Sequence, residues 1–314
     1  MPGVLDFEIK NGRVKLVIER LEDVLHGKGD VLVRILTCVF SGGHILLEDL
    51  PGLGKTTVAV AAAKALGLSF GRVQCTNDLL PTDVTGLNIF KAERGEFEFR
   101  PGPVFNNLLL VDEINRATPK TQSALLEAMG EEQVTIDGAT YRTPRPFTVI
   151  ATQNPIEHSG TFPLPESQMD RFMMRSRVGY PDRDSERDIL RAGSQKISIE
   201  NLPAVYGAAD VAENQELIER DVTVSGKIVD YVLAIAEATR GHPMIDAGIS
   251  TRGAMVLLKC AKCVAWMRGR NYVVPEDVKM FSLDILAHRM QPKSGVRADM
   301  TGIITSVMEE IPAP

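Results

Sequence analysis

Several features with strong implications are scarce or missing in this chain. Its 314 residues include only four cysteines, a number that suits a reducing compartment rather than a secreted fold built on disulfides. No apolar run approaches the length that a membrane-spanning helix needs, and the N-terminus lacks a basic segment followed by an apolar one. We therefore expect a cytoplasmic protein without a membrane segment.

An excess of positive charge is also missing. The formal net charge is −6, which argues against a protein that binds nucleic acid by charge alone. Hydrophobic residues make up 44% of the chain and charged residues 24%, as in ordinary soluble proteins. A chain of 314 residues can bury a sizeable core, and we expect it to split into two domains.

Two of the cysteines form the motif Cys260-x-x-Cys263, which invites a zinc or redox interpretation. A zinc site needs about four ligands, and neither a second motif of this kind nor a clear Cys/His pair accompanies this one. The two residues also share one face of an apolar helical pattern. We expect them to be small core residues.

Residues 48–57 read Glu-Asp-Leu-Pro-Gly-Leu-Gly-Lys-Thr-Thr. They follow an apolar stretch typical of a strand and open an alanine-rich helical stretch, which predicts the phosphate-binding loop of a nucleoside-triphosphatase. Loop N–H groups and the helix N-terminus cradle phosphate oxygens in such a loop. Lys55 is expected to reach the β/γ-phosphates, and the Thr56 hydroxyl to bind Mg²⁺. Asp49 departs from the usual pattern, which has a glycine there.

A second segment points to the same chemistry. Residues 108–111 are an unbroken apolar run, typical of a buried parallel strand, and it ends in Asp112 and Glu113. Hydrolysis needs one acid to hold Mg²⁺ and another to orient the attacking water. We assign these roles to Asp112 and Glu113 in that order. The expected nucleotide-binding residues are Pro51, Gly52, Leu53, Gly54, Lys55, Thr56, Thr57 and Asp112, with Thr56 and Asp112 as metal ligands.

These motifs resemble those of the MoxR-type AAA+ ATPases, and the resemblance runs through most of residues 40–290. An acid at Asp49 agrees with it, because the family commonly carries one at that position. The stretches that carry the resemblance are residues 43–52, 80–86, 95–103, 112–117, 151–155, and 163–166 leading into 170–172.

The pattern predicts an α/β fold, and the resemblance implies its type. We expect a parallel-sheet AAA+ core with helices on both faces and inserted β-hairpins over residues 1–185, then a smaller all-α lid over residues 186–314. Thr118-Pro119, Ser225 and Pro275 are expected to begin helices. The predicted strands are 45–47, 71–75, 107–111 and 147–151.

Two hairpins are expected to interrupt the core, at residues 88–99 and 133–141. They could decorate the surface, or they could face the central pore of a ring and engage a substrate there, as the resemblance implies. Phe97, Phe99 and Tyr141 could serve that contact or could be packed.

The resemblance also implies roles for four catalytic residues. Besides Glu113, Asn154 matches the first sensor, and Arg252 matches the second sensor, which could touch the γ-phosphate from the lid. Arg171 matches an arginine finger, a residue that stabilises charge on the γ-phosphoryl oxygens of a neighbouring subunit. Arg175 is the alternative finger.

The leading hypothesis is an ATPase that uses ATP and Mg²⁺, assembles into a homo-oligomeric ring, expected to be a hexamer, and remodels partner proteins as a chaperone does. The resemblance suggests partners with von Willebrand factor A domains. One alternative is a DNA-translocating motor, although the 133–141 hairpin carries no lysine or arginine. Another is a nucleotide-dependent binding switch with little turnover, against which the intact Glu113 argues.

Overall fold

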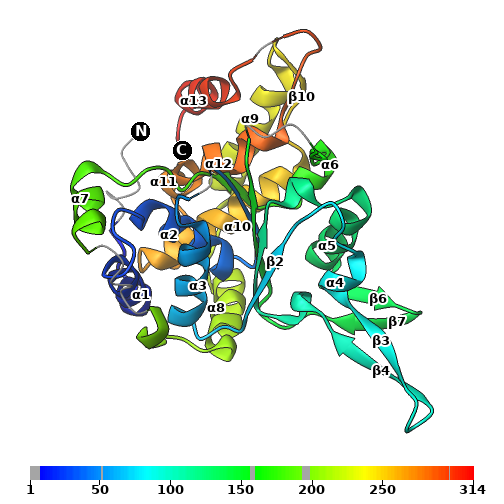
Figure 1. Cartoon of the computed structure of the whole chain (residues 1–314). Coiled ribbons are helices and arrows are strands. Elements are labelled where there is room, and N and C mark those ends of the chain that lie inside the picture. Colours follow the sequence, from blue (N-terminus) through cyan, green and yellow to red (C-terminus); the bar gives the residue numbers. More distant parts are fainter. Residues whose placement is uncertain (1–7, 51, 156–159, 193–198, 297) are drawn as a thin grey trace.

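The computed structural model describes residues 8–50, 52–155, 160–192, 199–296 and 298–314 (Figure 1). At its centre lies a parallel sheet of five strands in the order β2-β5-β8-β1-β9. Four of these strands confirm the predicted ones, and β9 was missed. The strands are β1 (Ile45–Glu48), β2 (Phe70–Gln74), β5 (Leu108–Asp112), β8 (Thr148–Gln153) and β9 (Met174–Ser176).

The central strands β5, β8 and β1 are buried on both faces of the sheet. Neighbouring residues of a strand point to opposite sides. Ile45 and Leu47 of β1 belong to one hydrophobic cluster, and Leu46 belongs to the other. The first cluster includes residues of α1 (Gly12–Glu22), α2 (Gly29–Phe40) and α3 (Lys55–Ala65). The second includes residues of α5 (Pro119–Glu131), beside which α4 (Pro81–Thr85) packs. The predicted α/β core with helices on both faces is confirmed.

The C-terminal part is mainly helical, as predicted, and it carries one short antiparallel strand pair. Its residues join the α1–α3 cluster in one continuous core, since α2 packs against both α8 and α10. The boundary between residues 185 and 186 stays a prediction. The elements are α6 (Glu166–Met169), α7 (Arg183–Ala192), α8 (Ala208–Asp221), α9 (Gly226–Gly241), β10 (Ile245–Ala247), α10 (Thr251–Met267), α11 (Pro275–Met280), α12 (Ser282–Leu286), β11 (Gln291–Pro292) and α13 (Met300–Glu310).

The helix starts read from the sequence are found where they were expected. The Thr118 side chain accepts a hydrogen bond from the backbone N–H of Thr121, which satisfies a donor that the first turn of α5 would leave unpaired. Ser225 caps α9 in the same way, and Pro275 is the first residue of α11.

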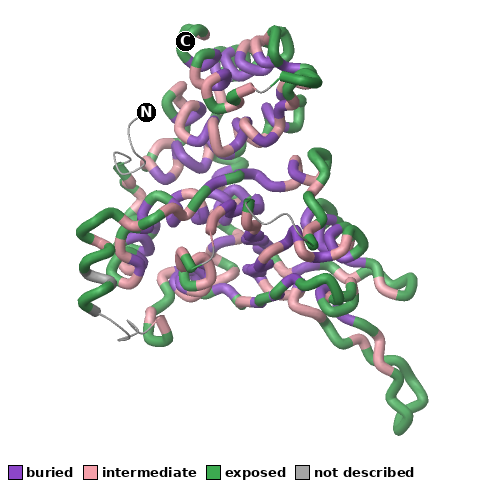
Figure 2. The backbone as a smooth tube through the Cα atoms, turned by 45° about the horizontal axis from the view of Figure 1, so that its top comes forward, coloured by how far each residue is buried: buried purple, intermediate pink, exposed green. Residues whose placement is uncertain are grey.

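Both predicted hairpins are present, and they are joined to each other. The first pairs β3 (Gly86–Lys91) with β4 (Glu96–Pro101), and the second pairs β6 (Gln133–Ile136) with β7 (Ala139–Arg142). The Phe99 and Tyr141 rings stack with their centroids 4.0 Å apart, so these two residues are packed. Phe97 is 70% exposed on the β3–β4 hairpin, which projects away from the body (Figures 1 and 2).

Neither a membrane segment nor a metal cluster is found in the described ranges. No helix there is long and apolar enough to cross a bilayer, and no group of three or more His, Cys, Asp or Glu residues is arranged to hold a metal. Cys260 and Cys263 are buried and unbridged in α10, as expected of core residues. Burial raises the pKa of the Cys263 thiol to about 12.

His44, just before β1, is a buried histidine that joins the sheet to α5. Its Nδ1 accepts a hydrogen bond from the backbone N–H of Val149 at 3.0 Å, so Nε2 carries the proton and donates to the Met129 carbonyl at 3.1 Å. This arrangement requires a neutral ring. Burial lowers the pKa of His44 to about 4 from its usual 6.5.

The neutral His44 ring predicts a loss of stability in acid. Because the folded-state pKa lies below the unfolded-state value, the stabilisation is complete above about pH 6.5 and is lost as the pH falls toward 4. Urea unfolding of wild type and His44→Gln should show their difference in unfolding free energy shrinking by about 2 kcal/mol from pH 7.5 to pH 5. A constant difference for His44→Gln would refute this account.

Candidate active site

The predicted phosphate loop runs from the carboxyl end of β1 to the first residue of α3, Lys55. Gly52 and Gly54 have φ angles of +86° and +84°, in the left-handed region that residues with a Cβ rarely adopt. Open space surrounds both positions, so backbone conformation rather than crowding explains the two glycines. Pro51, one of the predicted nucleotide-binding residues, lies outside the described residues.

The loop and the ends of β2, β5 and β8 surround one pocket of about 360 Å³. Most of the predicted nucleotide and catalytic residues line it, whereas Leu53 does not. The lining residues are Asp49, Gly52, Gly54, Lys55, Thr56, Thr57, Arg72, Gln74, Asp112, Glu113, Thr152, Gln153 and Asn154.

The Lys55 ammonium lies back against its own loop. It donates to the carbonyls of Asp49 at 2.7 Å and Leu50 at 2.8 Å. Partial burial lowers the pKa of Lys55, and the nearby carboxylates, including Asp112 and Glu113, oppose that shift. The charges of both acids thus act on Lys55.

The contacts of Asp49 explain why an acid stands where the usual pattern has a glycine. Its carboxylate accepts hydrogen bonds from the backbone N–H groups of Val178 at 2.5 Å and Gly179 at 2.8 Å. Lys28, in the turn before α2, donates to the Gly179 carbonyl at 2.7 Å. The acid therefore ties the phosphate loop to the chain that leaves β9. The sequence signalled Asp49 only as an exception and gave no sign of these partners.

The two predicted acids end β5, and Asp112 is already paired. Its carboxylate accepts from Arg72 Nε at 2.8 Å and from the Thr152 hydroxyl at 3.4 Å. The same hydroxyl accepts the backbone N–H of Glu113 at 3.0 Å, which helps to hold Glu113 at its left-handed φ of +57°. Arg72 was missed because β2 carries no motif. Only the pairing of β2 with β5 brings it to the pocket.

Glu113 is held by two side chains. One carboxylate oxygen accepts from Gln74 Nε2 at 3.1 Å and lies 3.3 Å from Nε of Arg116. Gln74 comes from β2, opposite Asp112 in the strand register, and was not predicted from the sequence. Asn154 follows β8 and lines the pocket, where the sequence placed it.

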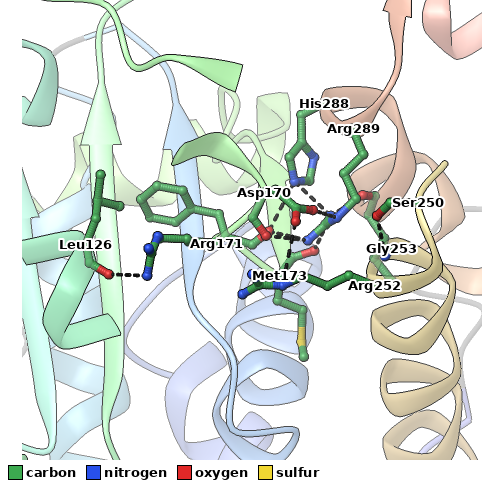
Figure 3. A network of polar contacts seen from close by, with 11 residues as sticks. Leu126, Asp170, Arg171, Met173, Ser250, Arg252, Gly253, His288 and Arg289 are labelled. Carbon is green, nitrogen blue, oxygen red and sulfur yellow. Dashed lines mark hydrogen bonds and ion pairs between the residues drawn. The ribbon is translucent and has the colours of Figure 1, made fainter. Parts of the chain in front are cut away.

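The predicted arginines do not line this pocket. Arg171 donates from Nη1 to the Leu126 carbonyl of α5 at 2.8 Å, and Arg175 lies 2.6 Å from the buried Glu48 carboxylate. Arg252, at the start of α10, is 59% exposed, with Nε 3.6 Å from Asp170 (Figure 3). That Arg252 touches the γ-phosphate from its own lid stays a prediction. In this structure α10 carries it to the Asp170–Arg171 segment.

The pocket suits a triphosphate with a hard metal ion. It combines an ammonium group and loop N–H groups for phosphate oxygens with a hydroxyl and a carboxylate, the oxygen donors that Mg²⁺ prefers. Thr56 and Asp112 are therefore a donor set that fits Mg²⁺. Glu113 and Asn154 lie at the same pocket with one charged and one neutral polar group.

Comparison with known proteins agrees with this geometry. The model of the ATPase family associated with various cellular activities (AAA) matches residues 44–174, and that of the AAA lid domain matches residues 237–311. A crystal structure from Cytophaga hutchinsonii, described as that of a candidate ATPase, superposes with a TM-score of 0.88 and 39% identity, covering 96% of this chain and 95% of that one.

Two relatives extend over most of the chain. YeaC of Bacillus subtilis strain 168, an uncharacterized protein, is 43% identical over 95% of this chain and 93% of its own length. The chaperone MoxR1 of Mycobacterium tuberculosis is 38% identical over 95% of this chain and 81% of its own length. With both family models, the matching fold and this relative in agreement, the chain belongs to the MoxR-type AAA ATPases.

Proposed function

We propose that this protein binds ATP with Mg²⁺, hydrolyses it in a ring of identical subunits, and uses the cycle to remodel partner proteins. One observation carries the proposal: the pocket between the phosphate loop and β5 gathers Lys55, Thr56, Asp112, Glu113 and Asn154. Membership of the AAA ATPases supports nucleotide binding.

The residues divide the work of binding. Loop N–H groups and Lys55 hold the β- and γ-phosphates, and Lys55 gives up its loop carbonyls to do so. Thr56 and Asp112 would hold the metal, and Asp112 would then part from Arg72. Bound Mg²⁺ supplies neutralisation of the charge on the phosphate oxygens.

Hydrolysis needs an oriented water molecule, and Glu113 is the residue we assign to it. Its carboxylate leaves Gln74 and Arg116 and accepts a hydrogen bond from the water that attacks the γ-phosphorus. Asn154 adds a neutral hydrogen bond to the water or the γ-phosphate.

The site is completed by a neighbouring subunit. Arg171 and Arg252 lie together near Asp170, away from the pocket of their own chain (Figure 3). This placement supports a role for them in the pocket of another copy, through a head-to-tail contact that closes into a ring, a hexamer in our proposal. We assign the arginine finger to Arg171, because Arg175 is engaged by Glu48 at 2.6 Å.

Remodelling of partner proteins is favoured over movement along DNA. The β3–β4 hairpin carries three cations, Lys91, Arg94 and Arg100, and as many acids, so it offers no net charge to phosphates. Exposed Phe90 and Phe97 on it suit contact with protein instead. MoxR1, a relative, is named a chaperone. Partners with von Willebrand factor A domains remain part of the proposal.

Binding and chemistry should separate in two variants. Glu113→Gln keeps size but loses the charge that polarises water, so it should bind a fluorescent ATP analogue normally and turn over roughly 10²–10⁴-fold more slowly. Lys55→Ala should lose binding itself. Glu127→Gln on α5 and Lys64→Ala on α3, both away from the pocket, are the matched controls. Wild-type turnover by Glu113→Gln would remove Glu113 from the chemistry.

The shared site makes a prediction about mixed rings. Arg171→Ala should bind ATP and lose turnover, by up to roughly 10³-fold. Mixing it with Lys55→Ala should restore part of the activity, because the first variant offers an intact pocket and the second an intact arginine. Turnover of each mixture is followed by phosphate release. Near wild-type turnover by Arg171→Ala alone in assembled rings would reject Arg171 and make Arg175 the next candidate.

A further inference from the structure

One guanidinium of the lid donates hydrogen bonds to the backbone on both sides of Arg171. Arg289 lies in the 3-10 turn Ala287–Arg289 after α12, and its side chain is 2% exposed. Its Nε donates to Oδ1 of Asp170 at 2.9 Å (Figure 3). Its other nitrogens donate to the carbonyls of Asp170 at 3.3 Å, Phe172 at 2.6 Å and Met173 at 3.1 Å. These acceptors flank Arg171 on both sides.

The same guanidinium is fixed to its own lid. The carbonyl of Ile285 accepts from Arg289. Nε2 of His288 lies 2.8 Å from Nη1 of Arg289 and 3.1 Å from the Phe172 carbonyl. Burial, followed by the charge of Arg289, lowers the pKa of His288 to about 3, which keeps the ring neutral. Arg289 therefore joins α12 rigidly to the segment from Asp170 to Met173.

The carboxylate of Asp170 contacts two parts of the lid. Oδ1 accepts from Arg289, and Oδ2 faces Nε of Arg252 at 3.6 Å. Arg252 stands in the first turn of α10, which Ser250 caps through the backbone N–H of Gly253. The turn after α12 and the start of α10 thus meet at one carboxylate of the core.

The backbone and the side chain of Arg171 are held by different parts of the molecule. Its backbone lies between residues gripped by Arg289, whereas its guanidinium donates to Leu126 of α5 and packs so closely on Gly130 that a Cβ there would lie 1.8 Å from Nη1. A shift of the lid relative to α5 must therefore change the aim of Arg171. Because a buried charge is costly without its acceptors, Arg289 and the groups that accept from it must move together in such a shift.

We propose that Asp170 and Arg289 are positioning residues, through which the lid of each subunit sets the aim of its own arginine finger. This inference rests on the proposed shared site. A hinge motion of the lid, of the kind open to two-part folds, would move both residues together. Asp170 and Arg289 then carry the nucleotide state of one subunit into the pocket of its neighbour.

The test is a pair of substitutions that removes both charges together. Asp170→Asn with Arg289→Gln leaves no unpaired buried charge. In assembled rings it should bind a fluorescent ATP analogue within about 2-fold of wild type and lose about 10-fold or more in kcat. Mixing with Lys55→Ala should restore activity, because the defect lies in the donated arginine. Adding Arg171→Ala should cost only roughly 3-fold more, since the finger is already displaced.

A matched ion pair supplies the control. Arg34 of α2 pairs with Asp284 of α12 at 3.1 Å, which also joins core to lid but touches neither Asp170 nor Arg171. Arg34→Gln with Asp284→Asn should keep kcat near wild type. Adding Arg171→Ala to this pair should lower kcat by the same factor as Arg171→Ala does in the wild-type chain. Thermal melting and ring mass are measured for every variant. If the main pair does not fold, Arg289→Lys, which keeps the buried charge but cannot reach all the acceptors, takes its place.

Three results decide the matter. Wild-type kcat in the variant Asp170→Asn with Arg289→Gln would overturn the proposal. The proposal would also fail if adding Arg171→Ala lowered kcat by the same factor in that variant and in the control pair. Loss of activity that Lys55→Ala subunits cannot restore would assign Asp170 and Arg289 a structural role instead. If Arg171→Ala and Lys55→Ala themselves fail to complement each other, the shared site fails first, and the two failures are thereby told apart.

Discussion

The pairing of β5, β8 and β1 is the constraint on which the candidate site depends. Their parallel register places Leu110 beside Ile150 and Ile150 beside Ile45, so the three carboxyl ends meet at one edge of the sheet. The phosphate loop follows β1, the acid pair follows β5 and Asn154 follows β8. Residues more than 90 positions apart in the sequence line one pocket, because the paired strands fix where each strand ends.

Around that edge, every charged group of the pocket described above has an internal partner. Lys55 lies on loop carbonyls, Asp112 on Arg72, and Glu113 on Gln74 and Arg116. Buried or half-buried charges need such compensation, which keeps the pocket folded while it waits for a ligand. In the proposed mechanism, nucleotide binding exchanges these partners for phosphate and metal.

The sequence predicted those parts of the molecule whose signals are local. Helix caps such as Thr118 and the 133–141 hairpin depend on neighbouring residues, and both were read correctly. β9 was missed because it has only three residues and no pattern of its own. Arg72, Gln74 and Arg289 were missed for another reason: their partners lie 39 or more residues away, and only tertiary packing identifies them. The contact between Arg252 and Asp170 was missed because the lid angle is invisible in sequence.

The central claim is that one chain holds a nucleotide pocket that a second chain must complete. The most direct measurement is specific ATPase activity across protein concentrations, with the mass of the assemblies followed in the same samples. The account predicts that activity per subunit is negligible where the chain is monomeric and rises in proportion to the fraction in rings, then levels off. Equal activity per subunit in monomers and rings would contradict it.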